Sequence, residues 1–190
     1  MKMINLPNRI IVIILFAIVL LPIKSNAQQD GPQTYRIVSI TTTGNQLYDS
    51  RTIVNYSGLA LGDEIAVPSD ESREAIRKLW NLGLFSDISL LIDKVVGNEA
   101  YLVIDVKELP RVESVVIKGN REMSTDDLKA RVNIVPGEVV TPQTLKDIEY
   151  NLKKYYEQEG YALAEISVDQ LLSGSNEARI RITVNEGKEL

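Results

Sequence analysis

The side chains that most often perform covalent or metal chemistry are missing from this sequence. None of its 190 residues is histidine and none is cysteine. Without histidine, Ser-His-Asp triads, histidine general acids and histidine-ligated metal sites are excluded. The carboxylate pairs Asp70-Glu71 and Asp126-Asp127 both stand where a helix is expected to begin. Acidic residues stabilise that end of a helix, so we interpret both pairs as helix-start residues rather than catalytic groups.

Basic and aromatic side chains meet at Lys153-Lys154 and Tyr155-Tyr156, near the end of a predicted helix. We expect the tyrosine side of this helix to pack against the protein, and the lysine side chains to stay solvated near the negatively polarised end of the helix. The chain has 21 basic and 26 acidic residues, a net charge of −5, which disfavours nucleic acid as a partner. No glycine-rich phosphate-binding loop is present, so we expect no cofactor, no metal and no enzyme activity.

The first 27 residues have the pattern of a secretory signal peptide. Lys2 and Arg9 precede an unbroken apolar run of twelve residues, 10–21, and Ser25-Asn26-Ala27 forms a cleavage site of small residues. Twelve apolar residues are too few to span a bilayer, which takes about 20. Cleavage would remove three basic residues and leave 18 basic and 26 acidic residues, a net charge of −8. We therefore predict an exported protein that is stabilised by packing and not by disulfides.

The rest of the sequence repeats itself once. A Gly44-Asn45 turn recurs as Gly119-Asn120, 75 residues later. The glycines 62 and 137 are also 75 residues apart, and the glycines 83 and 160 are 77 apart. Such regular spacing indicates a duplicated unit. We predict structural turns at eight positions: Gly44, Asn45, Gly62, Gly83, Gly119, Asn120, Gly137 and Gly160.

Each unit has the pattern strand, helix, helix, strand, strand. In the first unit, apolar residues alternate in the strands at 35–42, 88–93 and 101–106. In the second, the helix starting at Thr141-Pro142 keeps an apolar stripe to Gly160, and weaker strand patterns follow. Trp80 stands on the apolar stripe of a first-unit helix, so we expect it in the core or between the units.

This pattern predicts an α+β fold made twice, in which each unit is a three-stranded mixed sheet covered by two helices. The predicted divisions are a signal peptide at 1–27, a linker at 28–34, a first unit at 35–109, a second at 110–187 and the start of a further linker at 188–190. An open three-stranded sheet has free edges whose backbone groups can pair with an extended peptide almost regardless of its sequence. Alternatively, neighbouring segments block these edges and the strands serve packing alone.

The order of these signals resembles the POTRA domain. The passages Trp80–Ile88 and Tyr155–Tyr161 are similar to that domain's step from helix to strand. The junction Val106–Val112 resembles the link between the first two POTRA domains in the BamA family of outer-membrane protein assembly factors. Each motif is weak alone, but together they recur in order over residues 35 to about 187.

The resemblance implies a periplasmic receptor and scaffold at the outer membrane of a Gram-negative cell. Its implied partners are unfolded outer-membrane proteins, accessory assembly lipoproteins and, through a barrel missing from this chain, the outer membrane. The family's usual strand-accepting edge follows the second helix. In this sequence it corresponds to Ile88, Ser89, Leu90, Leu91, Ile92 and Asp93, and to Ile166, Ser167 and Val168.

Three alternatives remain open at the level of sequence. The units could belong to a TamA-like or two-partner-secretion transporter, or they could form a stand-alone periplasmic binding protein. A division protein is disfavoured because it would keep a membrane anchor in place of a cleavable signal. An enzyme is disfavoured by the missing histidine and cysteine.

Overall fold

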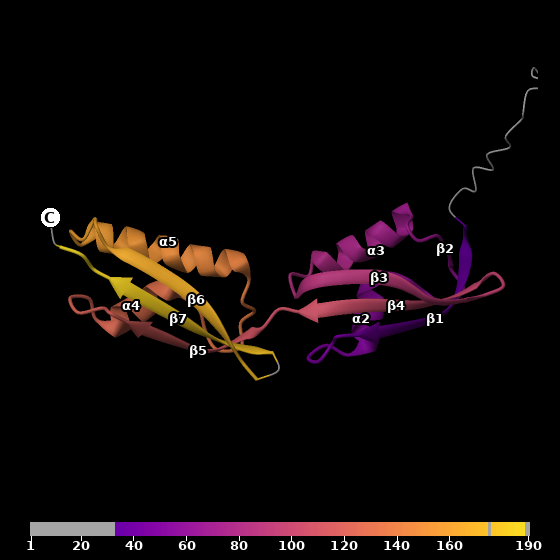
Figure 1. The fold of residues 1–190 in the computed structure, drawn as a ribbon, viewed down its shortest axis with the longest axis horizontal. Coiled ribbons are helices and arrows are strands. Elements are labelled where there is room, and N and C mark those ends of the chain that lie inside the picture. The colour runs from indigo at the N-terminus through magenta and orange to yellow at the C-terminus, as the bar shows by residue number, and fades with distance from the viewer. Residues whose placement is uncertain (1–32, 175, 189–190) are drawn as a thin grey trace, which may run out of the picture. The chain divides into compact units, whose positions relative to one another are not determined.

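The computed structural model describes residues 33–174 and 176–188, in which seven strands and four helices form two successive groups (Figure 1). The predicted signal peptide and most of the predicted linker lie outside the described residues. We call residues 35–108 the first repeat and residues 111–185 the second repeat. Both belong to one unit of the chain that begins at Pro32.

The first repeat contains four strands and two helices. In chain order these are β1 (Tyr35–Thr43), α2 (Ser50–Ser57), β2 (Glu64–Ile65), α3 (Asp70–Trp80), β3 (Phe85–Val96) and β4 (Glu99–Glu108). The second repeat contains β5 (Arg111–Lys118), α4 (Thr125–Val132), α5 (Pro142–Gln158), β6 (Glu165–Ser173) and β7 (Glu177–Asn185).

Short polar side chains fix where the helices begin. Asp49 accepts a hydrogen bond from the Thr52 N–H at the start of α2, and Ser69 accepts one from Ser72 at the start of α3. Ser124 and Thr141 cap α4 and α5 in the same way. Each cap satisfies a backbone N–H that the first helical turn leaves without a partner.

The two sheets share one topology. Their strand orders are β2-β1-β4-β3 and β5-β7-β6. β1 runs parallel to β4 and β5 parallel to β7, whereas β3 and β6 each pair antiparallel with the strand that follows them. Between the two parallel strands of each repeat the chain passes through both helices and then through β3 or β6, whereas the antiparallel pairs are joined by a hairpin turn. In these strand orders β3 and β6 are outer strands of their sheets.

Each repeat has its own hydrophobic core between the sheet and the helices. In the first repeat, Ile53 of α2 and Leu79 of α3 pack against Ile37, Leu102 and Ile104 of the sheet. The second core contains Leu128, Val132, Ile148, Leu152, Tyr156, Ile180 and Ile182. Both helices of a repeat thus cover the same face of its sheet, and the strands alternate between buried and exposed residues accordingly.

Two equivalent turns require glycine for a steric reason. Gly44 and Gly119 have φ angles of 77° and 88°. A Cβ atom at either position would stand 2.0 Å from a carbonyl oxygen, that of Val106 or Val184 respectively. No side chain fits so close to the backbone, which explains the first Gly-Asn signal of each repeat.

The α+β fold class with mixed sheets and helices on one face is confirmed, with one difference. The second sheet has three strands as expected, but the first gains the short strand β2, which pairs with Tyr35 and Arg36. The corresponding place in the second repeat holds a single bridge between Arg111 and Val139. One additional residue pair is enough to turn the bridge into a strand.

The outer strands are longer than expected. β3 extends from Phe85 to Val96, beyond the predicted 88–93, and β6 continues to Ser173. Their extensions contain exposed and polar residues, so they lack the apolar alternation that identifies a strand in sequence. Pairing with β4 and β7 forms them instead.

The expectation for Trp80 was wrong. Its side chain is 53% exposed, whereas Leu79, its neighbour on α3, is 1% exposed. Trp80 is the last residue of α3 and lies beside the buried stripe of the helix, not on it. A helix turns about 100° per residue, so adjacent positions can differ this much in burial.

Candidate functional site

The predicted binding residues of the first repeat lie in β3, at the edge of the sheet. Among the described residues β3 pairs only with β4, and its pairing shifts register between Phe85 and Asp87 and again between Ile92 and Lys94. Between the two shifts, residues 87–92 pair regularly with β4. Ile88 and Leu90 point into the core, and Leu91 is 51% exposed.

The predicted residues of the second repeat, Ile166, Ser167 and Val168, lie in β6, at the equivalent edge. β6 pairs with β7 over all nine of its residues, from Glu165 to Ser173, without a register shift. Leu172 near its end is 71% exposed. β6 therefore presents the longer regular edge of the two.

The opposite edge of each sheet is paired near the start of its first strand. β2 pairs with the start of β1, and the rest of that strand borders α2 along a shallow groove that includes Ile40 and Val54. In the second repeat, Val139 forms a bridge to Arg111 at the start of β5. The structure thus brings the predicted residues to edges, but it places them at two separate edges rather than in one site.

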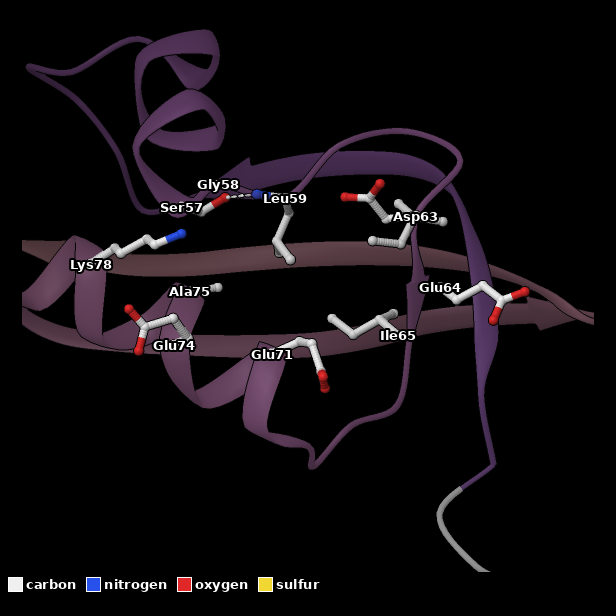
Figure 2. Close-up of a pocket in the computed structure, with 11 residues that line it drawn as sticks. Ser57, Gly58, Leu59, Asp63, Glu64, Ile65, Glu71, Glu74, Ala75 and Lys78 are labelled. Carbon is white, nitrogen blue, oxygen red and sulfur yellow. Dashed lines mark hydrogen bonds between the residues drawn. The ribbon is translucent and has the colours of Figure 1, made fainter.

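A pocket of about 380 Å³ lies beside α3 in the first repeat (Figure 2). Leu59 and Ile65 contribute apolar surface, and Glu71, Glu74 and Lys78 of α3 line the other side. Hydrogen bonds from the N–H of Glu71 itself and from Ser69 hold the pKa of the Glu71 carboxyl below its usual range. Glu71 thus stabilises the start of its helix, as expected from the sequence, and we assign no ligand to this pocket.

The end of the first repeat contains a carboxylate that the sequence interpretation missed. Glu108, the last residue of β4, is 7% exposed. Its oxygens accept hydrogen bonds from the backbone N–H groups of Gln46, Leu47 and Tyr48, at 2.9–3.1 Å. The carboxylate therefore holds the turn after β1 in place, and successive N–H groups directed at an anion form a strong acceptor site.

The second repeat attaches to the first through this carboxylate and its turn. Asn176, at the β6–β7 turn, donates its side-chain amide to Oε2 of Glu108 at 2.6 Å. Arg111 donates to the Tyr48 hydroxyl at 2.7 Å, and its guanidinium carbon stands 5.8 Å from the centre of that ring. These two polar links supplement the short covalent connection Leu109-Pro110.

An equivalent carboxylate lies directly after the second repeat. Glu186 is 7% exposed and accepts hydrogen bonds from the N–H groups of Arg121, Glu122 and Met123. In addition, it accepts the hydroxyl of Tyr156, which is fully buried in α5, at 3.0 Å. Tyr156 stands at the position of Leu79 in the first repeat. Glu108 therefore has no equivalent hydroxyl donor and accepts Asn176 of the second repeat instead.

These contacts shift the pKa values of both partners. Burial alone would raise the pKa of Glu186, but the N–H groups of Arg121 and Glu122, the Tyr156 hydroxyl and the Met123 N–H together lower it. Burial, followed by the hydrogen bond to Glu186, raises the pKa of the Tyr156 phenol. The carboxylate is therefore held charged and the phenol neutral, the states in which their hydrogen bond is strongest.

The signal for these residues was present in the sequence. Val106-Lys107-Glu108 and Val184-Asn185-Glu186 close their repeats at matching positions. The first lies in the junction Val106–Val112 and the second just before the predicted linker at 188–190, and the sequence interpretation gave neither glutamate a role. Both Tyr155 and Tyr156 were expected to pack. Tyr156 is fully buried and Tyr155 is partly buried under Arg131, but the bond from Tyr156 to Glu186 was not foreseen.

The described residues offer little for metal binding or membrane crossing. In residues 33–174 and 176–188, no group of three or more acidic side chains could hold a metal ion. No helix in these ranges is both long and apolar enough to cross a membrane.

Comparison with known sequences identifies relatives among outer-membrane assembly factors. Residues 110–187 match the family model POTRA, described as "Surface antigen variable number repeat". The outer membrane protein assembly factor BamA of Nitratidesulfovibrio vulgaris is 27% identical over 155 residues, which are 81% of this chain and 19% of that protein. BamA of Buchnera aphidicola is 25% identical over 121 residues, 62% of this chain and 19% of the relative. The chain thus spans about a fifth of these relatives.

Solved structures show the same fold. The N-terminal domain of Omp85 from Thermosynechococcus elongatus superposes with a TM-score of 0.57 at 14% identity, over 83% of this chain and 65% of that one. A three-domain POTRA fragment of Omp85 from Anabaena gives a TM-score of 0.51 at 16% identity, over 83% and 63% of the two chains. The second repeat therefore matches the POTRA family, the first repeat has the same topology, and the chain is similar in sequence to the assembly factor BamA.

Proposed function

We propose that this chain is a periplasmic receptor and scaffold for outer-membrane protein assembly, and that it binds unfolded β-barrel clients by strand addition. The observation that carries the proposal is the open edge strand of each sheet, β3 and β6, of which β6 is regular throughout. An added strand satisfies the outward backbone N–H and C=O groups of that edge, whatever the client's sequence. The relatives named as assembly factors supply the class of client.

The geometry favours β6 over β3 as the principal acceptor. A register shift in an edge strand bends it and interrupts its row of hydrogen-bonding groups. β3 has two such shifts and β6 has none. The regular part of β3 is limited to residues 87–92, whereas β6 offers nine residues, Glu165–Ser173.

Exposed apolar side chains near both edges suit a client strand that alternates apolar and polar residues. Leu91, Val95 and Val96 are 41–51% exposed on β3, and Leu171 and Leu172 are 39% and 71% exposed on β6. Consecutive strand residues face opposite sides of the sheet, so Leu171 and Leu172 offer apolar surface on both faces of β6, and every second side chain of a paired barrel strand lies on the face of one of them. Backbone pairing then allows the edge to bind clients of different sequences, and the apolar contact favours barrel strands over polar peptides.

A disulfide scan tests strand addition directly, because the chain itself contains no cysteine. The chain from residue 28 onward would carry Ser167→Cys in β6. A synthetic peptide from a transmembrane barrel strand would carry one cysteine, moved along its length. Strand pairing predicts cross-links at every second peptide position, because side chains alternate between the faces of a sheet.

Two controls make the scan decisive. Ser89→Cys places the same probe on β3, where we expect weaker cross-linking with the same alternation. Lys146→Cys places it on the exposed side of α5, where we expect background only. Equal cross-linking at all peptide positions, or at Lys146→Cys as much as at Ser167→Cys, would contradict strand addition.

A further inference from the structure

The outer strand of the second repeat ends where the outer strand of the first repeat begins. Phe85, the first residue of β3, pairs with Glu108, the last residue of β4. Ser173, the last residue of β6, pairs with Glu177 at the start of β7. The residue before Glu177 is Asn176, which donates its side-chain amide to Glu108 at 2.6 Å. The junction therefore brings the end of β6 close to the start of β3.

Residues of both outer strands line one space at this junction. The space has a volume of about 560 Å³. Gln170 and Leu172 line it from near the end of β6, and Ser86 lines it from near the start of β3. The connection Leu109-Pro110 borders the same space. The two outer strands therefore approach the junction from the same side, and one edge continues the other across this space.

The two outer strands also run in the same direction. β6 reaches the junction at its C-terminal end, whereas β3 leaves the junction from its N-terminal end. An added strand pairs with an edge either parallel or antiparallel, and the two orientations form different patterns of backbone hydrogen bonds. A client strand that lies along β6 therefore keeps the same orientation where it continues along β3.

The junction restrains the position of one edge relative to the other. The connection Leu109-Pro110 has only two residues, and the proline ring fixes its own φ angle. Asn176 is bonded to the Glu108 carboxylate, and this link is charge-assisted. Arg111 donates to the Tyr48 hydroxyl at 2.7 Å. Once a client occupies one edge, binding at the other is intramolecular, which raises the client's effective concentration there.

From this arrangement we infer that one unfolded client segment adds to β6 and β3 at the same time, in a single orientation. The inference rests on the proposed function, because each edge must first accept a strand by itself. β6 offers nine residues and the regular part of β3 offers six, 87–92, so the bound segment has at least 15 extended residues. One transmembrane barrel strand has only about 9–11 residues.

This length requirement separates unfolded clients from partly folded ones. The two strands of a β-hairpin lie side by side, about 4.8 Å apart, so a hairpin is only as long as one of its strands. A barrel hairpin therefore fits along β6 or along β3, but not along both. Two successive barrel strands that are still extended reach both edges. The chain thus holds a client most tightly before its hairpins form, and one edge is released when they form.

Titration calorimetry with a set of peptides, against the chain from residue 28 onward, tests the inference. The long peptide contains two successive transmembrane strands of an outer-membrane barrel with their turn, about 24 residues. Each strand alone is a short peptide, and a disulfide between the ends closes the long peptide into a hairpin. The linear long peptide should bind at least about tenfold more tightly than either short one, because an effective concentration of about 1 mM acts on a dissociation constant of about 0.1 mM. The hairpin should bind like a short peptide.

Double cross-linking tests whether one peptide bridges both edges. A variant with Ser89→Cys and Ser167→Cys carries one cysteine on each outer strand. Six residues of β6 follow Ser167 and four residues of β3 precede Ser89, so a long peptide with two cysteines should form both links only when these are more than ten residues apart. Antiparallel pairing links the N-terminal half to β3 and the C-terminal half to β6, parallel pairing gives the reverse, and only one order should occur. With Lys146→Cys in place of Ser89→Cys, only one link should form.

The outcomes distinguish this inference from the proposed function. If short peptides cross-link at each edge with the expected alternation, but the linear long peptide binds no more tightly than the better short one, the inference is overturned and strand addition stands. The inference is equally overturned if the hairpin binds as tightly as the linear peptide, or if both orders of cross-linking occur. If no peptide cross-links to either edge, the inference and the proposed function fail together.

Discussion

Asn176 donates its amide to Glu108 at 2.6 Å, although 68 residues separate them in sequence. The same carboxylate already holds three backbone N–H groups of the turn 46–48. One buried glutamate therefore both orders a turn of its own repeat and receives the next repeat. Such a charge-assisted bond is about twice as strong as a neutral one, which makes this junction sensitive to single substitutions.

Asn176→Ala should loosen the junction without unfolding either core. We expect the free energy of unfolding to fall by about 1–2 kcal/mol, because the substitution removes one hydrogen bond to a charged group. Spin labels on Ser89→Cys and Ser167→Cys, one in each repeat, should give a broader distance distribution by electron paramagnetic resonance. Asn98→Ala is the matched control, since its side chain has no partner in the described residues. Equal effects of the two substitutions would refute a role for Asn176 in the junction.

Glu186 should make the stability of the second repeat depend on acid pH. Its pKa lies below the usual value of 4.5, so its contribution is complete above about pH 4.5 and is lost as pH falls through the lowered pKa. Glu186→Gln should cost about 1–3 kcal/mol at pH 7, because buried N–H groups lose their charged acceptor.

Urea unfolding at pH 7 and pH 3 separates this effect from a general loss of stability. Between these pH values Glu186→Gln should lose less stability than wild type, whereas Glu157→Gln on the exposed side of α5 should behave as wild type. A loss on acidification that is the same in all three proteins would show that Glu186 titrates normally.

Tyr156 should make stability depend on alkaline pH in the opposite direction. Its pKa is raised, so its contribution is complete below its usual value of 10.0 and is lost as pH rises through the raised pKa. Tyr156→Phe keeps the buried ring and removes the hydroxyl, and should cost about 1–2 kcal/mol at neutral pH. Unfolding curves between pH 8 and 11 check this, because the difference between the two proteins should shrink only at the alkaline end.

Leu152→Ala should destabilise the second repeat by about 2–5 kcal/mol, because Leu152 is fully buried between α5 and the sheet. Its neighbour Lys153 is exposed, and Lys153→Ala should stay within about 0.5 kcal/mol of wild type. Denaturant unfolding followed by circular dichroism measures both. A mutant as stable as wild type would be incompatible with this helix packing.

The fluorescence of Trp80 should report on the first repeat, and its side chain should be accessible to solvent in the native state. It is the only tryptophan in the chain, and its side chain is 53% exposed in the fold. Acrylamide should therefore quench its fluorescence in the native protein nearly as well as in urea. Strong protection in the native state would indicate that Trp80 is covered by a contact absent from the described residues.

Spacing in the sequence was sufficient to predict the repeated architecture. The constant distance between glycines and the two helical stripes predicted a sheet covered by two helices, twice, because turns and amphipathic periods are local properties. The Gly-Asn turns were equally predictable, although their cause, a carbonyl oxygen 2.0 Å from where a Cβ would be, is visible only in the fold. The candidate edges depended on the resemblance, since no local pattern separates an outer strand from an inner one.

The features that only tertiary structure decided involve residues far apart in the chain. Strand ends set by a partner, such as Ser173 of β6, carry no periodic signal of their own. The exposure of Trp80 depends on where α3 ends relative to the sheet.

Glu108 and Glu186 look like ordinary charged residues at the ends of strands. Only folding brings three N–H groups from a turn at least 60 residues away onto each carboxylate. The sequence determined the repeat and its secondary structure because these follow from local periodicity and turn residues. The tertiary structure decided which buried charges find donors, because that depends on contacts between distant segments.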